Sequence, residues 1–424
     1  MQGQRLVSHP ITQLQGELCV PGDKSISHRA LILGAIAEGI TCVDHFLHSD
    51  DCLATLDILR SMGVCIDQLS DEKIKIHGVG LYGLKQPQHI LDCGNSGTSM
   101  RLLAGLLVGQ AFDSILTGDA SLLKRPMARI CTPLIQMGAD ISMQDGDLAP
   151  LVIHGVKTLR GIDYTMPVAS AQVKSSLLLA GLYAKGDTCV HEPHITRDHT
   201  ERMLRVFSYQ DTGIGCGIDL KIPGDLSSAA FFIVAATLIP GSDLMLRGVG
   251  VNPTRTGVIH ILQAMGAQIT LENRQMYGEE PVADIAVRHA ELKGIDIAAS
   301  MVSLSIDEFP ILFIAAAMAS GTTRVFGIGE LRHKESDRIS VMAEGLKQLN
   351  INIVEKKESL VIEGGEIQGG VVDSHADHRV AMAFLVAGAV AHDSIRILNT
   401  EAISTSFPKF VDCFNEVGGH VAPD

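Results

Sequence analysis

Residues 58–67 read ILRSMGVCID, and the same phrase returns as LIQMGADISM at 134–143 and as ILQAMGAQITL at 261–271. In each copy an apolar pattern with helical spacing ends at Met-Gly, and alternating apolar residues follow. Glycine stops a helix because it adopts a positive φ without steric penalty, so each phrase predicts an amphipathic helix followed by a strand. Weaker copies lie at 346–355 and 414–422, and a degenerate sixth copy lies at 204–215.

Upstream of each copy lies a second helical segment that is apolar or small on every side. These six segments begin near residues 28, 99, 173, 229, 309 and 379, so the repeat averages about 70 residues. Segments such as HRALILGAIAEG and FPILFIAAAMASG have no polar face, which indicates burial against sheets and other helices. Three such units make a domain of roughly 200 residues, so we expect two domains of mixed α/β (α+β) class.

Six αβ units could also form a doubly wound sheet or a barrel, and the periodicity alone leaves both open. A parallel barrel needs single strands that alternate strictly with helices. The segments VCIDQLSDEKIKIHGVG (64–80) and DISMQDGDLAPLVIHG (140–155) instead have the pattern of paired short strands joined by turns. This pattern favours sheets that contain antiparallel hairpins.

Composition limits the classes of function. The chain has 424 residues, 46% of them hydrophobic, and its 34 basic and 48 acidic residues give a net charge of −14. Such a protein is no general binder of nucleic acid, so an anionic ligand needs a focused site. Nine cysteines without a CxxC pair favour reduced thiols in a cytoplasmic protein and argue against structural zinc. The N-terminal pattern is not that of a signal peptide, and no apolar run reaches about 18 residues, so we expect no membrane partner.

Cationic and amide side chains gather where the apolar helices of the first half should begin. Helix N-termini present free N–H groups and a partial positive charge, so these segments are suited to anions. The residues are Lys24, Ser25 and Arg29; Asn95, Ser96, Gly97, Thr98 and Arg101; Lys124, Arg125 and Arg129; and Ser170, Gln172 and Lys174. The first three segments alone are also explained by an N-cap, by plain turn chemistry and by a charged surface helix, respectively. In the fourth, a cap explains Ser170 but not Gln172 and Lys174.

The second half adds carboxylates beside cations. SLSIDEFPILFIAAA places Asp307 and Glu308 at a helix start, where either an acidic N-cap or a proton acceptor would stand. In ELRHKESDRIS, on a helix, Lys334 and Arg338 would share one face with Glu335 on the neighbouring one; the alternative is an exposed salt-bridged helix.

The sixth apolar helix begins with Asp377, His378 and Arg379 in DSHADHRVAMAF. His375 and His378 lack the partner cluster that a metal site needs. Four of the six apolar helices thus begin with cationic or amide side chains in an acidic chain. This pattern predicts two anionic ligands held between two domains.

From about residue 7 to 415 the sequence resembles the 5-enolpyruvylshikimate-3-phosphate synthase family. The family's motifs occur in order as GDKSISHR, GNSGTSMR, RPM, SAQVK, GDLSSAAFF, IDEFP, RHKESDR and ADHR. The resemblance implies the two-domain enolpyruvyl transferase fold, an inside-out α/β barrel with three βαβαββ units per domain. The first domain would be discontinuous, 1–22 plus 224–424, and the second would be 23–223. The crossovers would lie near 21–24 and 222–226, with the active site in the cleft between the domains.

The resemblance also implies the reaction. The enolpyruvyl group of phosphoenolpyruvate would pass to the 5-hydroxyl of shikimate 3-phosphate, with release of phosphate, in chorismate and aromatic amino-acid biosynthesis. Protonation of the methylene carbon makes C2 electrophilic, the hydroxyl adds, and the tetrahedral ketal then loses phosphate and a proton. No cofactor and no metal is implied. The expected partners are the two substrates alone, with no nucleic acid or membrane, and we expect a cytoplasmic monomer that is a glyphosate target.

The residue roles that the resemblance implies fall into three groups. The catalytic residues would be Lys24, Asp307 and Glu335. The phosphoenolpyruvate ligands would be Lys24, Asn95, Gly97, Thr98, Arg125, Gln172, Arg338 and Arg379. The shikimate 3-phosphate ligands would be Lys24, Ser25, Arg29, Ser170, Ala171, Gln172, Arg197, Asp307 and Lys334.

The chain departs from the more heavily studied form of the family at two positions. Thr405 stands where that form has a lysine, and Leu102 stands where it has a proline. With RDHTE at 197–201 and NPTR at 252–255, these residues are similar to the class II variety.

Two alternative functions compete with this interpretation. The UDP-N-acetylglucosamine enolpyruvyl transferase family shares the fold but begins with Lys-Asn and bears a reactive loop cysteine; here Ser25 follows Lys24, and Cys131 lies in a predicted helix. A non-catalytic binding protein for phosphorylated metabolites would not need an acid–base pair such as Asp307 and Glu335.

Overall fold

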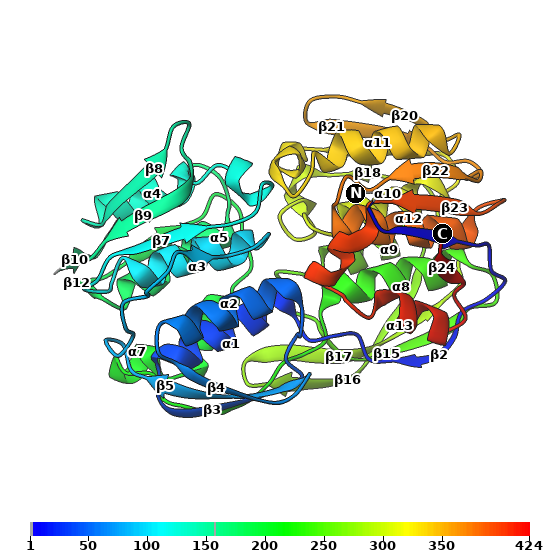
Figure 1. Cartoon of the computed structure of the whole chain (residues 1–424). Coiled ribbons are helices and arrows are strands. Elements are labelled where there is room, and N and C mark those ends of the chain that lie inside the picture. Colours follow the sequence, from blue (N-terminus) through cyan, green and yellow to red (C-terminus); the bar gives the residue numbers. More distant parts are fainter. Residues whose placement is uncertain (1–2, 157) are drawn as a thin grey trace. The chain divides into compact units, whose positions relative to one another are not determined.

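The computed structural model describes residues 3–156 and 158–424 of the chain (Figure 1). The fold divides into two compact units. Unit 1 comprises residues 1–21, 223–276 and 281–424, and unit 2 comprises residues 22–222 and 277–280. Each unit has its own hydrophobic core. The chain passes from one unit to the other at residues 21–22 and 222–223, and the short segment 277–280 adds two further changes of unit at 276–277 and 280–281.

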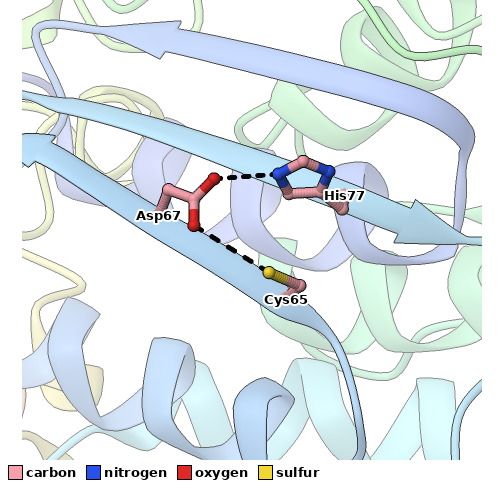
Figure 2. A group of neighbouring side chains, drawn as sticks. All are labelled: Cys65, Asp67 and His77. Atoms are coloured by element: carbon pink, nitrogen blue, oxygen red, sulfur yellow. Dashed lines mark hydrogen bonds and ion pairs between the residues drawn. The ribbon is translucent and has the colours of Figure 1, made fainter.

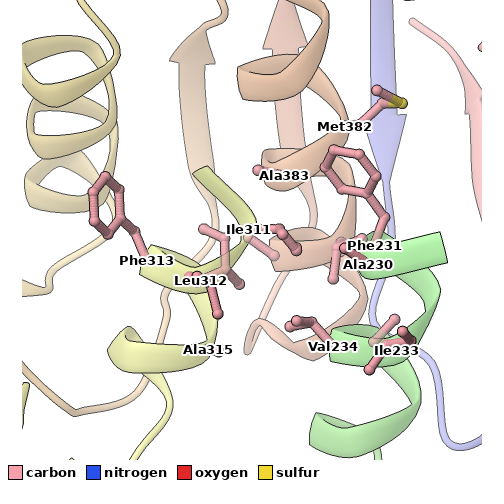
Figure 3. Packing of buried hydrophobic residues seen from close by; sticks show 14 of the residues in the cluster. Ala230, Phe231, Ile233, Val234, Ile311, Leu312, Phe313, Ala315, Met382 and Ala383 are labelled. Carbon is pink, nitrogen blue, oxygen red and sulfur yellow. The ribbon is translucent and has the colours of Figure 1, made fainter. Parts of the chain in front are cut away.

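The six apolar segments form six buried helices, as predicted. They are α1 (Lys24–Ile36), α3 (Gly97–Leu107) and α5 (Ala171–Gly181) in unit 2, and α8 (Leu226–Leu238), α10 (Phe309–Ala317) and α12 (His378–Val390) in unit 1. Every residue of α8 is buried, because its side chains leave no polar face. In unit 1 the three helices contact one another. Figure 3 shows Phe231 of α8, Ile311 of α10 and Met382 of α12 within this core.

The Met-Gly phrase ends a helix in all three clear copies. Gly63, Gly138 and Gly266 have φ values of +90°, +97° and +110°, and a strand follows each of them. In the weaker copy at 346–355 Asn350 takes the same left-handed conformation, with φ +68°. The helices of this second set are α2 (Asp50–Ser61), α4 (Ala128–Gln136), α6 (His199–Val206), α9 (Gly257–Met265), α11 (Arg338–Gln348) and α13 (Phe410–Glu416).

From residue 3 onward, the described part of unit 1 forms three four-stranded sheets, one for each repeat. The first has the order β22 (Gly370–Asp373), β23 (Ile395–Leu398), β1 (Arg5–Ser8) and β24 (Val421–Pro423). The second has the order β16 (Gln268–Tyr277), β17 (Glu280–Arg288), β15 (Asp243–Gly250) and β2 (Gln15–Leu18). The third has the order β18 (Asp296–Ile297), β19 (Thr322–Phe326), β21 (Ser359–Glu363) and β20 (Asn352–Glu355).

In unit 2, the residues on either side of position 157 form two such sheets. One has the order β14 (Asp219–Lys221), β3 (Glu38–Asp44), β5 (Lys73–Val79) and β4 (Cys65–Ser70). The other has the order β6 (Leu91–Asp92), β7 (Ser114–Thr117), β9 (Leu148–His154) and β8 (Asp140–Gln144). The pairs β4–β5 and β8–β9 are antiparallel, so the two hairpins predicted from the sequence are confirmed.

The third repeat of unit 2 differs from the others. It contains the parallel pairs β10 (Leu159–Arg160) with β12 (Ala184–Lys185) and β11 (Asp163–Thr165) with β13 (Cys189–His191). After α6, Ser208 has a positive φ and the short helix α7 (Tyr209–Thr212) follows. The next strand, β14, then pairs with β3, in the sheet that contains the β4–β5 hairpin. The degenerate sequence at 204–215 thus lacks the strand pattern for a hairpin of its own.

The described residues also include four short 3-10 helices: η1 (Leu122–Lys124), η2 (Ala299–Met301), η3 (Gly329–His333) and η4 (Thr400–Thr405). Across the described ranges no helix has both the length and the apolar character needed to cross a membrane.

Candidate functional site

At the start of α1 in unit 2, two cations are held by neighbouring side chains. The Asp23 carboxylate caps the helix by accepting from the Ile26 N–H. Lys24 Nζ lies 3.0 Å from Asp51 Oδ2 in a largely buried ion pair. Asp51 was not singled out in the sequence, because it lies 27 residues away on α2.

Arg29 is the most constrained cation of this helix. It is 4% exposed and donates to Thr200 Oγ1 at 2.6 Å, to Ser175 Oγ at 2.7 Å and to the Ser25 carbonyl at 2.8 Å. Burial lowers the pKa of Arg29 to about 10, so the guanidinium remains charged at neutral pH. Each terminal nitrogen still has a second N–H for a ligand. Arg197 is half-buried and close enough to contribute to that lowering of the Arg29 pKa.

The loop before α3 is fixed by an arginine and an amide. Ser96 caps α3, and Asn95 Oδ1 accepts from Arg125 Nη2 at 2.8 Å. Asn95 Nδ2 donates to Asp119 Oδ2 at 2.6 Å. Arg125 is only 6% exposed, whereas Lys124 is exposed at the end of η1. The sequence segment RPM therefore contributes one positioned guanidinium to this loop.

Helices α3 and α5 are joined through an amide side chain. Arg101 Nη1 donates to Gln172 Oε1 at 2.7 Å, and Gln172 Nε2 donates to Thr98 Oγ1 at 3.1 Å. Gly97 is the first residue of α3 and does not have a positive φ. A methyl group there would approach the guanidinium groups of both Arg101 and Arg125. Because Gly97 has no side chain, the guanidinium groups of Arg101 and Arg125 can both lie close to this position.

The start of α5 combines a cap with a buried lysine. Ser170 caps the helix, which begins at Ala171. Lys174 is 5% exposed and bonds Glu192 at 2.8 Å and Glu201 at 2.6 Å. Two carboxylates therefore neutralise Lys174 and attach α5 to α6 and to the segment between them.

Unit 1 gathers carboxylates around one buried arginine. Arg338 is 1% exposed, and it lies 2.8 Å from Asp377, 2.6 Å from Glu335 and 3.5 Å from Asp307. Lys334 Nζ lies 3.0 Å from the same Asp307 oxygen. Burial lowers the pKa of Arg338, but the charges of Asp377 and Glu335 outweigh burial and leave it raised, so Arg338 stays charged.

The prediction that Lys334, Glu335 and Arg338 lie on one helix is wrong. The 3-10 helix η3 ends at His333, and Lys334 has an extended backbone. Helix α11 begins only at Arg338, because Asp337 caps it by accepting from two backbone N–H groups. The side chains nevertheless converge, since Lys334 and Arg338 both contact Asp307.

A second network of polar contacts surrounds Glu308, the residue that follows Asp307. Glu308 is the N-cap residue of α10, but its side chain makes no capping bond. Instead it accepts from Ser227, and it lies 3.9 Å from Arg255 and 3.7 Å from Arg379. Arg379 donates to the Asp307 carbonyl at 2.9 Å. Ser227 lies in the motif GDLSSAAFF and Arg255 in the segment NPTR. Both motifs were recognised in the sequence, but no role was predicted for either residue.

Cys131 does not resemble a reactive loop cysteine. It is fully buried in α4, and burial raises the pKa of its thiol to about 12. A thiol in that state supplies almost no thiolate at neutral pH.

Comparisons with known proteins agree along nearly the whole chain. The model of the family EPSP synthase (3-phosphoshikimate 1-carboxyvinyltransferase) matches residues 8–414. The 3-phosphoshikimate 1-carboxyvinyltransferase of Legionella pneumophila is 60% identical over 420 residues, covering 96% of this chain and 97% of its own. That of Acidithiobacillus ferrooxidans is 55% identical over 425 residues, covering 98% of each chain.

Solved structures show the same fold. EPSP synthase from Acinetobacter baumannii has a TM-score of 0.88 at 49% identity, covering 99% of this chain and 100% of its own. The enolpyruvyl transferase NikO from Streptomyces tendae has a TM-score of 0.81 at 15% identity, covering 100% of this chain and 99% of its own, and shows likeness of fold alone. The expected mixed α/β enolpyruvyl transferase fold is confirmed.

Proposed function

The chain belongs to the EPSP synthase (3-phosphoshikimate 1-carboxyvinyltransferase) family, and from this premise we propose which of its residues carry the reaction. The enzyme transfers the enolpyruvyl group of phosphoenolpyruvate to the 5-hydroxyl of shikimate 3-phosphate and releases phosphate, a step of the shikimate pathway. The activity expected from the sequence is thereby confirmed. The observation that carries the proposal is the convergence of Lys334 and Arg338 on Asp307.

We propose that Asp307 is the base that accepts the proton of the 5-hydroxyl. An ionised carboxylate is the form that accepts a proton, and two cations within 3.5 Å stabilise it electrostatically. The bond from Arg379 to the Asp307 carbonyl fixes the backbone of the same residue. Asp307 is thus supported at both its side chain and its main chain, as a positioned base requires.

Glu335 and Lys24 are the proposed proton-transfer partners at the methylene carbon. Glu335 lies 2.6 Å from Arg338, which orients one of its oxygens, and the Lys24 ammonium lies 3.0 Å from Asp51. Glu335 belongs to unit 1 and Lys24 to unit 2, so each unit contributes one of the two proposed partners.

The guanidinium and amide groups are proposed to bind the anionic groups of the two substrates. Arg125, Arg338 and Arg379 are each nearly buried and held by other side or main chains, so they are preorganised for carboxylate and phosphate oxygens. With them we assign to phosphoenolpyruvate Lys24, Asn95, Gly97, Thr98 and Gln172. To shikimate 3-phosphate we assign Lys24, Ser25, Arg29, Ser170, Ala171, Gln172, Arg197, Asp307 and Lys334.

The experiment that tests the assignment of the base is Asp307→Ala in a phosphate-release assay with both substrates. A positioned general base contributes about 10²–10⁴-fold, so kcat should fall by that factor while shikimate 3-phosphate still binds. Asp296→Asn is the matched control, because Asp296 pairs with Arg324 on the exposed surface of the same unit. A fall in kcat of less than about tenfold for Asp307→Ala would rule out this role.

We further propose that the enzyme is of the class II variety. The residues at two positions support this: Thr405, whose hydroxyl donates to the Ala402 carbonyl within η4, stands in place of a lysine, and Leu102, which is fully buried in α3, stands in place of a proline. Weak inhibition by glyphosate is the expected result of a steady-state titration against phosphoenolpyruvate. An inhibition constant far below the KM for phosphoenolpyruvate would contradict the class II assignment.

A cytoplasmic monomer is the last element of the proposal. All nine cysteines are free, four of them exposed, which fits a reducing compartment. No assigned role calls for a residue from a second copy of the chain. Light scattering of the purified enzyme would show the mass of one chain, and a stable dimer would contradict this element.

A further inference from the structure

The β4–β5 hairpin of unit 2 brings a thiol, a carboxylate and an imidazole together. Cys65 and His77 are partners in the antiparallel register, and Asp67 follows Cys65 by two residues on the same face. Asp67 Oδ1 lies 3.9 Å from Cys65 Sγ, and Asp67 Oδ2 lies 2.9 Å from His77 Nε2 (Figure 2). All three ligand atoms lie within 4.8 Å of one another.

These separations suit one metal ion. Zinc binds thiolate sulfur at about 2.3 Å and imidazole nitrogen or carboxylate oxygen at about 2.0–2.2 Å, so tetrahedral ligand atoms lie about 3.3–3.7 Å apart. The two separations, 2.9 and 3.9 Å, lie on either side of that interval. The thiol and the imidazole face different oxygens of Asp67, so side-chain rotation must close the remaining gap, and the exposed side chains of Cys65 and Asp67 are free to rotate. The two paired strands meanwhile hold their Cα positions.

The thiol distinguishes this cluster from other histidine–carboxylate pairs. Such pairs also occur at His154–Asp113, His191–Asp163 and His392–Glu366. Near one of them, Cys189 is the register partner of Asp163 and precedes His191 by two residues. Among the residues that the structure describes, only Cys65, Asp67 and His77 form a group of three with ligand atoms this close. The β4–β5 hairpin therefore offers three possible metal ligands, whereas each of the other pairs offers two.

We propose that the β4–β5 hairpin binds one divalent transition-metal ion of the zinc type through Cys65 Sγ, Asp67 and His77 Nε2. Solvent completes the coordination. Thiolate and imidazole select such an ion over calcium or magnesium, which prefer oxygen ligands alone. Binding releases the thiol proton of Cys65 to solvent and replaces the hydrogen bond between His77 and Asp67. Lys75, opposite Asp67 in the register, adds a positive charge that limits the affinity.

None of the three ligands is among the residues assigned to the reaction, so binding at this site is separable from catalysis. The test is calorimetric titration of the reduced, metal-free, full-length enzyme with Zn²⁺. The variants are Cys65→Ser and His77→Ala, with Cys189→Ser as the matched control because it removes an exposed thiol beside a histidine–aspartate pair. We expect one strong site in the wild type and in the control. Loss of an outer-shell partner alone weakens a site about 10–100-fold, so loss of a ligand should cost at least about tenfold in affinity.

Cobalt gives a spectroscopic reading of the same site. Co²⁺ should produce a thiolate-to-metal charge-transfer band in the wild type and in Cys189→Ser, and the band should disappear in Cys65→Ser. Phosphate release should be equal in all variants, which verifies that they fold. Because the ion ties β4 to β5 only in the folded state, Zn²⁺ should raise the Tm of the wild type and not that of Cys65→Ser. Equal Zn²⁺ affinity in wild type and Cys65→Ser, or loss of the band in Cys189→Ser, would overturn the proposal.

Discussion

A methyl group at Gly97 should harm substrate binding without harming the fold. A Cβ at this position would lie 2.8 Å from Arg101 Nη1 and 3.1 Å from Arg125 Nη1. Ordinary contact begins at 3.4 Å, so the two guanidinium groups must retreat by about 0.6 and 0.3 Å. Both are side-chain ends, and each has a partner to lose, since Arg101 bonds Gln172 and Arg125 bonds Asn95.

The magnitude follows from these displacements. A misplacement of about 1 Å in a catalytic constellation costs about 10²-fold, so about half that distance should cost about tenfold in kcat/KM for phosphoenolpyruvate. Stability should not fall, because Gly97 has no positive φ and alanine fits its helical backbone without strain. Alanine is favoured over glycine in a helix by up to about 1 kcal/mol, so the Tm should stay the same or rise by about 2–4 °C.

The assay combines steady-state phosphate release at varied phosphoenolpyruvate with calorimetric unfolding. Gly365→Ala is the matched control, because a Cβ there would meet only Ile351 at an ordinary 3.7 Å. An unchanged KM for phosphoenolpyruvate together with a lowered Tm in Gly97→Ala would refute the reasoning, since backbone strain would then outweigh displacement. Glyphosate, the longer molecule, should suffer more than the substrate, so its inhibition constant should rise by a larger factor than KM. Equal factors would contradict the steric explanation.

Three further perturbations test the charged and buried groups. Asp377→Asn removes the fully buried carboxylate that pairs with Arg338, which should cost about 3–5 kcal/mol and lower the Tm of unit 1 by about 6–20 °C in calorimetry; an unchanged Tm would exclude a stabilising ion pair. Glu308→Gln should raise the KM for phosphoenolpyruvate about tenfold through Arg379 and change kcat little, and a loss confined to kcat would instead place Glu308 in the chemical step. Burial lowers the pKa of His28 to about 3 in the folded protein. Below about pH 6.5, His28 is therefore protonated in the unfolded chain but still neutral in the folded one. The free energy of unfolding should therefore decrease by about 1.4 kcal/mol per pH unit as pH falls from 6.5 towards 3, and His28→Gln should flatten this slope in denaturant titrations.

The sequence by itself determined the repeat, the buried helices and the residues at their starts. These features depend on contacts within a few residues. Gly63 ends α2 because the left-handed conformation suits glycine, and α8 is buried because none of its positions offers a polar face. Caps such as Asp23 and Ser170 act on N–H groups three residues away, so their motifs mark the helix starts directly.

Only the tertiary structure decided which charges meet. Lys334 and Arg338 share Asp307 although they do not share a helix, because an extended segment and the cap of α11 set their directions. Glu308 meets Ser227 across 81 residues. Cys65, Asp67 and His77 come together through strand register, which fixes neighbours by pairing and not by spacing along the chain. Such contacts depend on how separate elements pack and pair, which local sequence patterns do not encode.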